Sequence, residues 1–147
     1  PFLNRDLGKM IEYARKSKKI EFIDTTTNAS LLTPERSKEV INAGLDKINI
    51  SIDGMTTDQY MQFTKYKMDM QELVENVKWF YEHKEQCEVM VKIPGDLISE
   101  EQKQAFRGRN MTPDHVIEAI IRHELEDITL EQSVNEVLGE RQGLVSW

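Results

Sequence analysis

The stretch that decides the fold reads LDKINISIDG and covers residues 45–54. Isoleucines stand at positions 48, 50 and 52, and polar residues stand at positions 47, 49 and 51. Because side chains alternate between the two faces of a strand, this pattern predicts a strand with one apolar and one polar face. The Asp53-Gly54 pair that follows is a turn signal and ends the strand.

Helical patterns lie on both sides of this strand. Thr33 can cap a helix that starts at Pro34, and Gly44 ends it, as a residue that tolerates positive φ does. Apolar residues at helical spacing predict further helices, and short β-prone runs predict two more strands. The expected order is helix, strand, helix, strand, helix, strand, helix, over residues 6–18, 20–23, 33–44, 45–52, 70–83, 89–93 and from 99 onward.

Strands that alternate with helices indicate parallel βαβ units with right-handed crossovers, and hence an α/β fold. In such folds, ligands bind at the carboxyl ends of the strands. The segments to inspect are therefore 24–30, 51–54 and 92–96, and within the last of these Lys92 and Asp96 are polar residues able to face a ligand.

Charge divides the chain of 147 residues unevenly. The net charge is -7, yet residues 112–147 hold eight acidic and two basic side chains, while the rest is nearly neutral. We expect a βα domain at 1–106, a linker at 107–111 and an acidic helical tail at 112–147. The tail should form a hairpin of two helices that begin at Thr112 and Thr129, the second ending at Gly139.

This acidity argues against nucleic-acid binding, which needs phosphate neutralisation. The tail instead suits a protein partner or self-association. No apolar run approaches the roughly 18 residues of a membrane span, and no signal peptide is visible, so we expect a cytoplasmic protein without a membrane partner.

Two places in the sequence carry residue types that can bind metals. Cys87 is the one cysteine of the chain, which excludes an intrachain disulfide and a cluster held by several of its own thiolates. His115 and Glu118, with His123 and Glu124, have the types of a metal site but no established spacing. We expect them to lie on an exposed helical surface, and we predict no metal site.

Several segments together resemble the middle of a radical S-adenosylmethionine (radical SAM) domain. The relevant runs are TTNASLLT at 26–33 and AGLDKINISIDG at 43–54. In that family, a Thr-Asn-Gly segment ends the third strand, and an Ala-Gly-Leu-Asp helix end leads into a Ser-Ile-Asp-Gly strand. The likeness covers residues 1 to about 106; Ala29 departs from it, replacing the usual glycine. It implies a partial (β/α) barrel with parallel strands.

The resemblance also implies site residues. Thr27 and Asn28 match positions that approach S-adenosylmethionine, and Ser51 and Asp53 match positions that bind its carboxylate or ribose. Pro1 matches the proline after a Gly-Gly-Glu segment that holds the methionyl amine. The implied reaction is reductive cleavage of S-adenosylmethionine to a 5′-deoxyadenosyl radical, which then modifies a small-molecule or peptide substrate of unknown identity.

One defining feature of the family does not occur in these 147 residues. The Cys-x3-Cys-x2-Cys loop that binds a [4Fe-4S] cluster would precede Pro1, and Cys87 cannot replace it. We therefore expect a fragment or truncated member, not catalytic as this chain alone. The alternatives are a non-catalytic α/β remnant that serves as an interaction module through its acidic tail, and a small nucleotide-binding protein, for which a Gly-rich first turn is missing.

Overall fold

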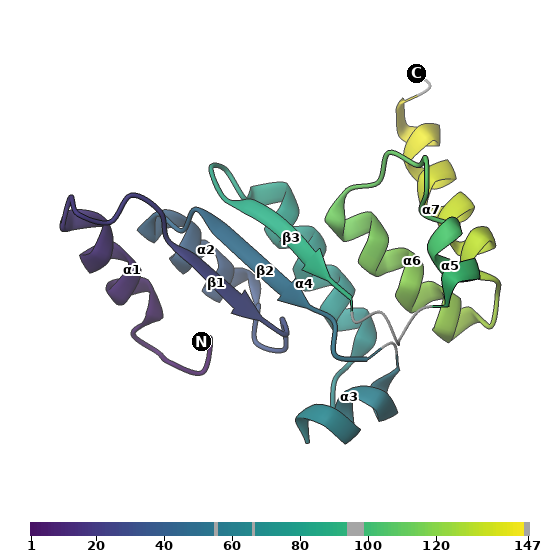
Figure 1. Cartoon of the computed structure of the whole chain (residues 1–147), viewed down its shortest axis with the longest axis horizontal. Helices are drawn as coiled ribbons and strands as arrows, with labels where there is room; N and C mark the ends of the chain where they lie inside the picture. The colour runs from purple at the N-terminus through teal and green to yellow at the C-terminus, as the bar shows by residue number, and fades with distance from the viewer. Residues whose placement is uncertain (55, 66, 94–98, 146–147) are drawn as a thin grey trace. The chain divides into compact units, whose positions relative to one another are not determined.

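The computed structural model of the chain describes residues 1–54, 56–65, 67–93 and 99–145 (Figure 1). The described chain divides into two compact units, one formed by residues 1–52 and 75–92 and the other by residues 53–74 and 93 onward. Residues 94–96, which were predicted to end the third strand and which include Asp96, lie outside the described residues. The boundary at 107–111 remains a prediction.

A parallel sheet of three strands forms the centre of the first unit. Its strands are β1 (Asp24–Thr27), β2 (Lys47–Ser51) and β3 (Glu88–Lys92), in that spatial order. The predicted α/β class with parallel strands is therefore confirmed.

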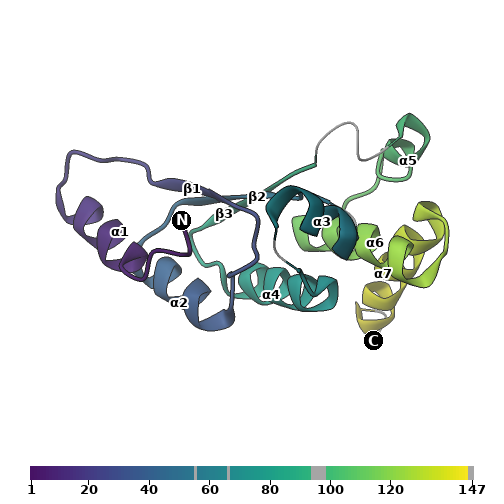
Figure 2. The ribbon, with the colours of Figure 1, turned by 90° about the horizontal axis from the view of Figure 1, so that it is seen from below.

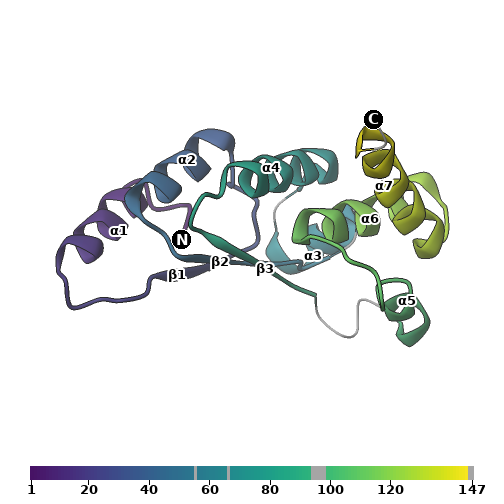
Figure 3. The same ribbon diagram turned by 90° about the horizontal axis from the view of Figure 1, so that it is seen from above.

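Three helices lie on one face of this sheet, as Figures 2 and 3 show from opposite sides. They are α1 (Leu7–Lys16), α2 (Pro34–Ala43) and α4 (Met70–His83), whose residues 75–83 belong to this unit. Ile48 and Ile50 are fully buried and belong to the core of this unit, which confirms the apolar face predicted for β2, and Asn49 between them is also buried.

The ends of α2 explain why a helix forms there. The Thr33 hydroxyl accepts a hydrogen bond from the Arg36 amide at 3.3 Å, and Pro34 occupies the first turn. Gly44 ends the helix with φ of 101°, a conformation that a residue without Cβ adopts at little cost. Both predicted helix signals are confirmed.

The prediction of a strand at 20–23 was wrong by about one strand length. The threonines at 25–27 pair with β2, whereas Ile20 and Phe22 are largely exposed. Asp46 accounts for this shift, because its amide donates to the Ile23 carbonyl and its carboxylate accepts from the Ile23 amide. These bonds fix the chain just before β1, so the ladder starts at Asp24.

The second unit is helical in its described residues. It contains α3 (Thr57–Thr64), α5 (Glu100–Gln104), α6 (Pro113–Glu126) and α7 (Leu130–Val145). Helices α6 and α7 pack together through a cluster that includes Ala119, Ile120, Val134 and Val137. The predicted cap of α7 is confirmed, since Thr129 and Gln132 exchange backbone and side-chain hydrogen bonds of 2.9 and 3.1 Å.

Two expectations for this unit were wrong, and one helix was missed. Helix α3 was not predicted, although the Thr56 hydroxyl caps it by accepting from the Gln59 amide. Helix α7 continues through Gly139, because one glycine weakens a helix interior by only about 1 kcal/mol. His115 and Glu118 are 8% exposed rather than on an exposed surface, and His115 Nδ1 accepts a hydrogen bond from the Thr112 amide at the start of α6.

Candidate functional site

The face of the sheet opposite the helices carries mostly polar residues. Residues paired across parallel strands point to the same side, so Ser51 and Lys92 share this face, as do Asn49 and Met90 in the row before. Ser51 is half-buried and Lys92 is exposed. The carboxyl end of β2 and β3 therefore presents a hydroxyl beside an ammonium group.

The loop after β1 is held by its own polar side chains. The Thr27 hydroxyl accepts from the Ala29 amide at 3.1 Å, and Asn28 Oδ1 accepts from the Ser30 amide at 3.1 Å. Thr27 is 6% exposed and pairs with Ile50, which places it on the helix-covered face of the sheet. Asn28 is half-buried at the end of the strand.

Ala29 adopts φ of 62°, in the left-handed region that favours glycine. The residue is 1% exposed. This conformation gives a physical reason for the glycine that the resembling family has at this position. The substitution keeps the turn and adds backbone strain.

Of the four predicted site residues, the structure places three at the carboxyl ends of β1 and β2 in the first unit. These are Thr27, Asn28 and Ser51. Asp53 is half-buried and follows β2 by two residues, as the first residue of the second unit. Their roles toward a cofactor remain predictions.

In the second unit, the loop that begins at Asp53 packs tightly on α3. A Cβ atom on Gly54 would lie 2.8 Å from the Tyr60 amide nitrogen and 2.7 Å from the Gln59 Cβ. Burial raises the pKa of the Tyr60 hydroxyl far above its usual value. Close packing against α3 thus requires a residue without a side chain at position 54.

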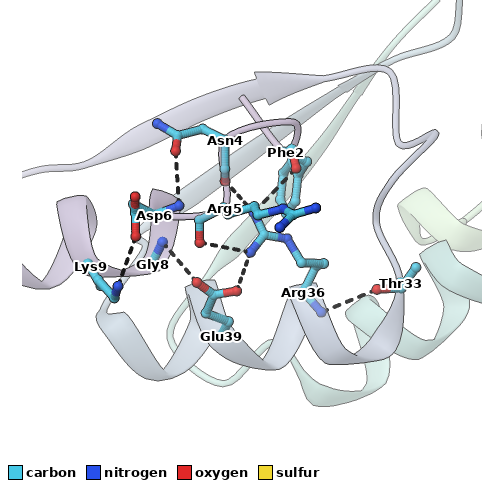
Figure 4. Close-up of polar contacts among 9 residues, drawn as sticks. All are labelled: Phe2, Asn4, Arg5, Asp6, Gly8, Lys9, Thr33, Arg36 and Glu39. Atoms are coloured by element: carbon cyan, nitrogen blue, oxygen red, sulfur yellow. Dashed lines mark hydrogen bonds and ion pairs between the residues drawn. The ribbon is translucent and has the colours of Figure 1, made fainter.

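An arginine in the first turn of α2 binds the N-terminal segment, as Figure 4 shows. The Arg36 guanidinium donates to the carbonyls of Phe2, Asn4 and Arg5 at 3.3, 2.5 and 3.4 Å. It also binds the Glu39 carboxylate at 2.5 Å. Sequence reasoning missed this arginine, because its carbonyl partners lie 31 to 34 residues away and carry no side-chain signal.

Cys87 does not fit a role as an iron–sulfur ligand. It is fully buried and immediately precedes β3, at the amino end of the sheet, whereas the candidate site lies at the carboxyl end. Burial raises the pKa of its thiol to about 12, so the thiolate that binds iron is disfavoured. No group of three possible metal-ligating side chains occurs among the residues that the structure describes.

A separate cavity of about 590 Å³ lies between α2 and α4. Ile41, Trp79 and His83, from the later turns of the two helices, line part of it. These turns lie toward the amino ends of the strands, because the helices run antiparallel to them. The cavity is therefore not part of the carboxyl edge.

A comparison of this sequence with protein-family models gives a match over the part of the chain that contains all three parallel strands. The model of the radical SAM superfamily matches residues 1–103. The chain belongs to the radical SAM superfamily. The predicted resemblance is confirmed over nearly the whole range expected for it.

Relatives within this superfamily have related but longer sequences. GTP 3′,8-cyclase of Clostridium acetobutylicum is 36% identical over 66 residues, which cover 45% of this chain and 20% of the relative. Probable GTP 3′,8-cyclase of Methanococcus maripaludis strain C7 is 39% identical over 64 residues, which cover 44% of this chain and 21% of the relative. The probable GTP 3′,8-cyclase of Methanocaldococcus jannaschii is 31% identical over 78 residues, which cover 53% of this chain and 25% of the relative.

This radical SAM chain thus spans a quarter or less of the length of these relatives. No solved structure was found to match it. Within the described residues, no helix has the length and apolar character needed to cross a membrane.

Proposed function

We propose that this chain forms the central, S-adenosylmethionine-binding part of a radical SAM domain. The observation that supports this most directly is the placement of Asn28 and Ser51 at the carboxyl ends of adjacent parallel strands, where ligands bind in such folds. The three strands are then consecutive members of a partial barrel, whose inner face is the polar side of the sheet.

Each polar group has a distinct capacity toward the cofactor. Asn28 Oδ1 is engaged by the Ser30 amide, which leaves the Nδ2 protons to donate to a carboxylate or ribose oxygen. Thr27 lies on the helix-covered face, so its hydroxyl, which accepts from the Ala29 amide, holds the loop that presents Asn28 rather than reaching the polar face. Ser51, on the polar face, completes the proposed set within the first unit, with a short side chain that leaves room for a ligand. Asp53 belongs to the second unit, and its role stays a prediction.

Catalysis requires more than this chain supplies. In the superfamily, S-adenosylmethionine bound to a [4Fe-4S] cluster provides a 5′-deoxyadenosyl radical for hydrogen abstraction. Cys87 is the single cysteine of the 147 residues, and its burial and position do not suit cluster binding. We propose that the chain binds the cofactor but does not perform radical chemistry by itself.

GTP is the first substrate to test. The relatives that match the chain are named GTP 3′,8-cyclases, and Lys92 places a cation on the polar face of the sheet, where it could pair with a phosphate.

Titration calorimetry with S-adenosylmethionine tests the proposed binding. The unchanged chain should bind, and Ser51→Ala should weaken binding about tenfold, the effect of one lost hydrogen bond to a charged group. Ser17→Ala is the matched control, because Ser17 is exposed at the end of α1, toward the amino ends of the strands. A chain that does not bind S-adenosylmethionine would contradict the proposal.

Anaerobic reconstitution with iron and sulfide tests the second part. We expect no [4Fe-4S] absorbance from this chain alone. A stoichiometric cluster would show that the proposed lack of catalysis is wrong, without affecting the proposal for cofactor binding.

A further inference from the structure

The N-terminal segment of the chain has little regular structure of its own. Residues 1–6 contain turns, and Asn4 donates its amide to the Pro1 carbonyl at 2.9 Å. Phe2 is 5% exposed, so its ring is anchored in the core, while residues 3–6 are exposed. The position of this segment therefore depends on contacts made by other elements.

Arg36 provides those contacts. Its guanidinium group reaches the carbonyls of Phe2, Asn4 and Arg5 at once, and its side chain is only 20% exposed. A planar fork with five N–H donors can serve several acceptors in a fixed geometry, whereas the ammonium group of lysine cannot span them. No other described side chain donates to these three carbonyls.

Glu39, one turn further along α2, completes the arrangement shown in Figure 4. One carboxylate oxygen binds Arg36 at 2.5 Å, and the other accepts from the Gly8 amide at 3.3 Å. A Cβ atom on Gly8 would lie 2.5 Å from the Glu39 side chain, so the absence of a side chain at Gly8 permits this approach. We call Arg36 and Glu39, with the carbonyls and the amide that they bind, the Arg36 clamp.

The Arg36 clamp lies at the same end of the sheet as the candidate site. Arg36 is the third residue of α2, and α2 begins directly after the loop that holds Thr27 and Asn28 at the carboxyl end of β1. Its amide is bonded to Thr33, the last residue of that loop. The clamp thus holds the N-terminal segment at the first turn of α2, directly after the loop that carries two of the predicted cofactor-binding residues.

We propose that Arg36 is a positioning residue for the S-adenosylmethionine site, because its guanidinium fixes residues 2–5 beside the first turn of α2, which follows the loop at the carboxyl end of β1. This inference rests on the proposed function. Arg36 touches no cofactor in this scheme; it determines where the N-terminal segment lies beside the site, and cofactor affinity depends on that position.

Arg15 offers a matched control within the same unit. It also binds a carboxylate from a distant element, that of Asp46, and a backbone carbonyl, that of Gly44 at 2.7 Å. Its side chain is 35% exposed, so the two arginines have comparable surroundings. Arg15 lies near the end of α1, where the strands begin, and so is remote from the carboxyl edge.

The experiment compares Arg36→Lys with Arg15→Lys by calorimetric titration with S-adenosylmethionine and by thermal unfolding. Both variants should lower the melting temperature, but only Arg36→Lys should weaken binding, by about tenfold, or about 1.4 kcal/mol. Amide exchange at residues 2–8 should rise in Arg36→Lys and not in Arg15→Lys. Arg36→Gln, which retains one amide donor group, is the second variant if the lysine variant does not fold.

If both variants bind S-adenosylmethionine as tightly as the unchanged chain does, the role of Arg36 is overturned and the proposed function stays intact. A comparable loss in both would also overturn it, because the effect would then be one of general stability. If the unchanged chain does not bind S-adenosylmethionine, the proposed function fails, and this role fails with it.

Discussion

The guanidinium group of Arg15 binds the carboxylate of Asp46, a residue 31 positions further along the chain. Asp46 also accepts a hydrogen bond of 2.8 Å from the Ile23 amide. One side chain therefore connects the end of α1, the entry to β1 and the entry to β2. This carboxylate fixes the amino end of the sheet.

Asp46→Asn should destabilise the first unit by about 1 to 2 kcal/mol, because an amide cannot replace a charged acceptor for both Arg15 and the Ile23 amide. Urea denaturation measures the effect. Glu21→Gln, at an exposed carboxylate, should change the midpoint little. An equal shift in the two variants would show that Asp46 has no special part in stability.

The contribution of Asp46 should depend on pH. Burial disfavours its charged form, but the bonds from the Ile23 amide and Arg15 outweigh burial and hold the pKa of Asp46 below its usual value. A carboxyl with a lowered pKa in the folded state stabilises the fold above the unfolded pKa, about 4, and loses this effect as pH falls through the folded pKa. The difference between the unchanged chain and Asp46→Asn should therefore shrink below pH of about 4, as followed by urea denaturation at each pH. A difference that stays constant down to the acid limit would contradict this.

Ala29 should respond to substitution in an unusual way, because its φ of 62° is left-handed. Ala29→Gly relieves strain and loses one buried methyl group, so stability should change by less than about 1 kcal/mol. Ala29→Val adds a β-branch and should destabilise by more than about 1 kcal/mol. Ala14→Gly, within the right-handed helix α1, is the control and should cost about 1 kcal/mol. Chemical denaturation measures the stability of the three variants. If Ala29→Gly destabilised the chain more than Ala29→Val does, the left-handed turn at Ala29 would be contradicted.

Gly54 and Gly139 should give opposite results when changed to alanine. A Cβ atom at Gly54 would meet the backbone of α3 within 3 Å, so Gly54→Ala should destabilise by about 1 to 3 kcal/mol. A Cβ at Gly139 meets nothing within 4 Å and lies inside α7, so Gly139→Ala should stabilise by up to about 1 kcal/mol. Thermal unfolding followed by circular dichroism measures both. Destabilisation by Gly139→Ala would indicate that α7 ends at this glycine.

Much of the fold could be predicted from local patterns. The alternation in β2 and the signals at Thr33 and Gly44 involve residues within a few positions of one another, and these predictions were confirmed. The start of β1 was misplaced, since the Ile23–Asp46 bonds that fix it join distant segments. The Arg36 clamp escaped prediction for the same reason: its acceptors are backbone carbonyls, which every residue has.

Site prediction had a similar limit. Strand alternation correctly placed Ser51 on the polar face, but it gave no face for Thr27 because the strand itself was set too early. Once the register is known, Thr27 pairs with Ile50 on the helix side. The family resemblance selected these positions as candidates, and the structure gives the face of the sheet on which Thr27 and Ser51 lie.

The burial of Cys87 has a practical consequence for studying this chain. Its thiol is 0% exposed within the first unit, and no second cysteine exists to react in its place. An alkylating reagent can reach it only when that part of the molecule opens. The rate of labelling therefore measures how often the sheet and its covering helices come apart, and the natural sequence carries its own reporter of local unfolding.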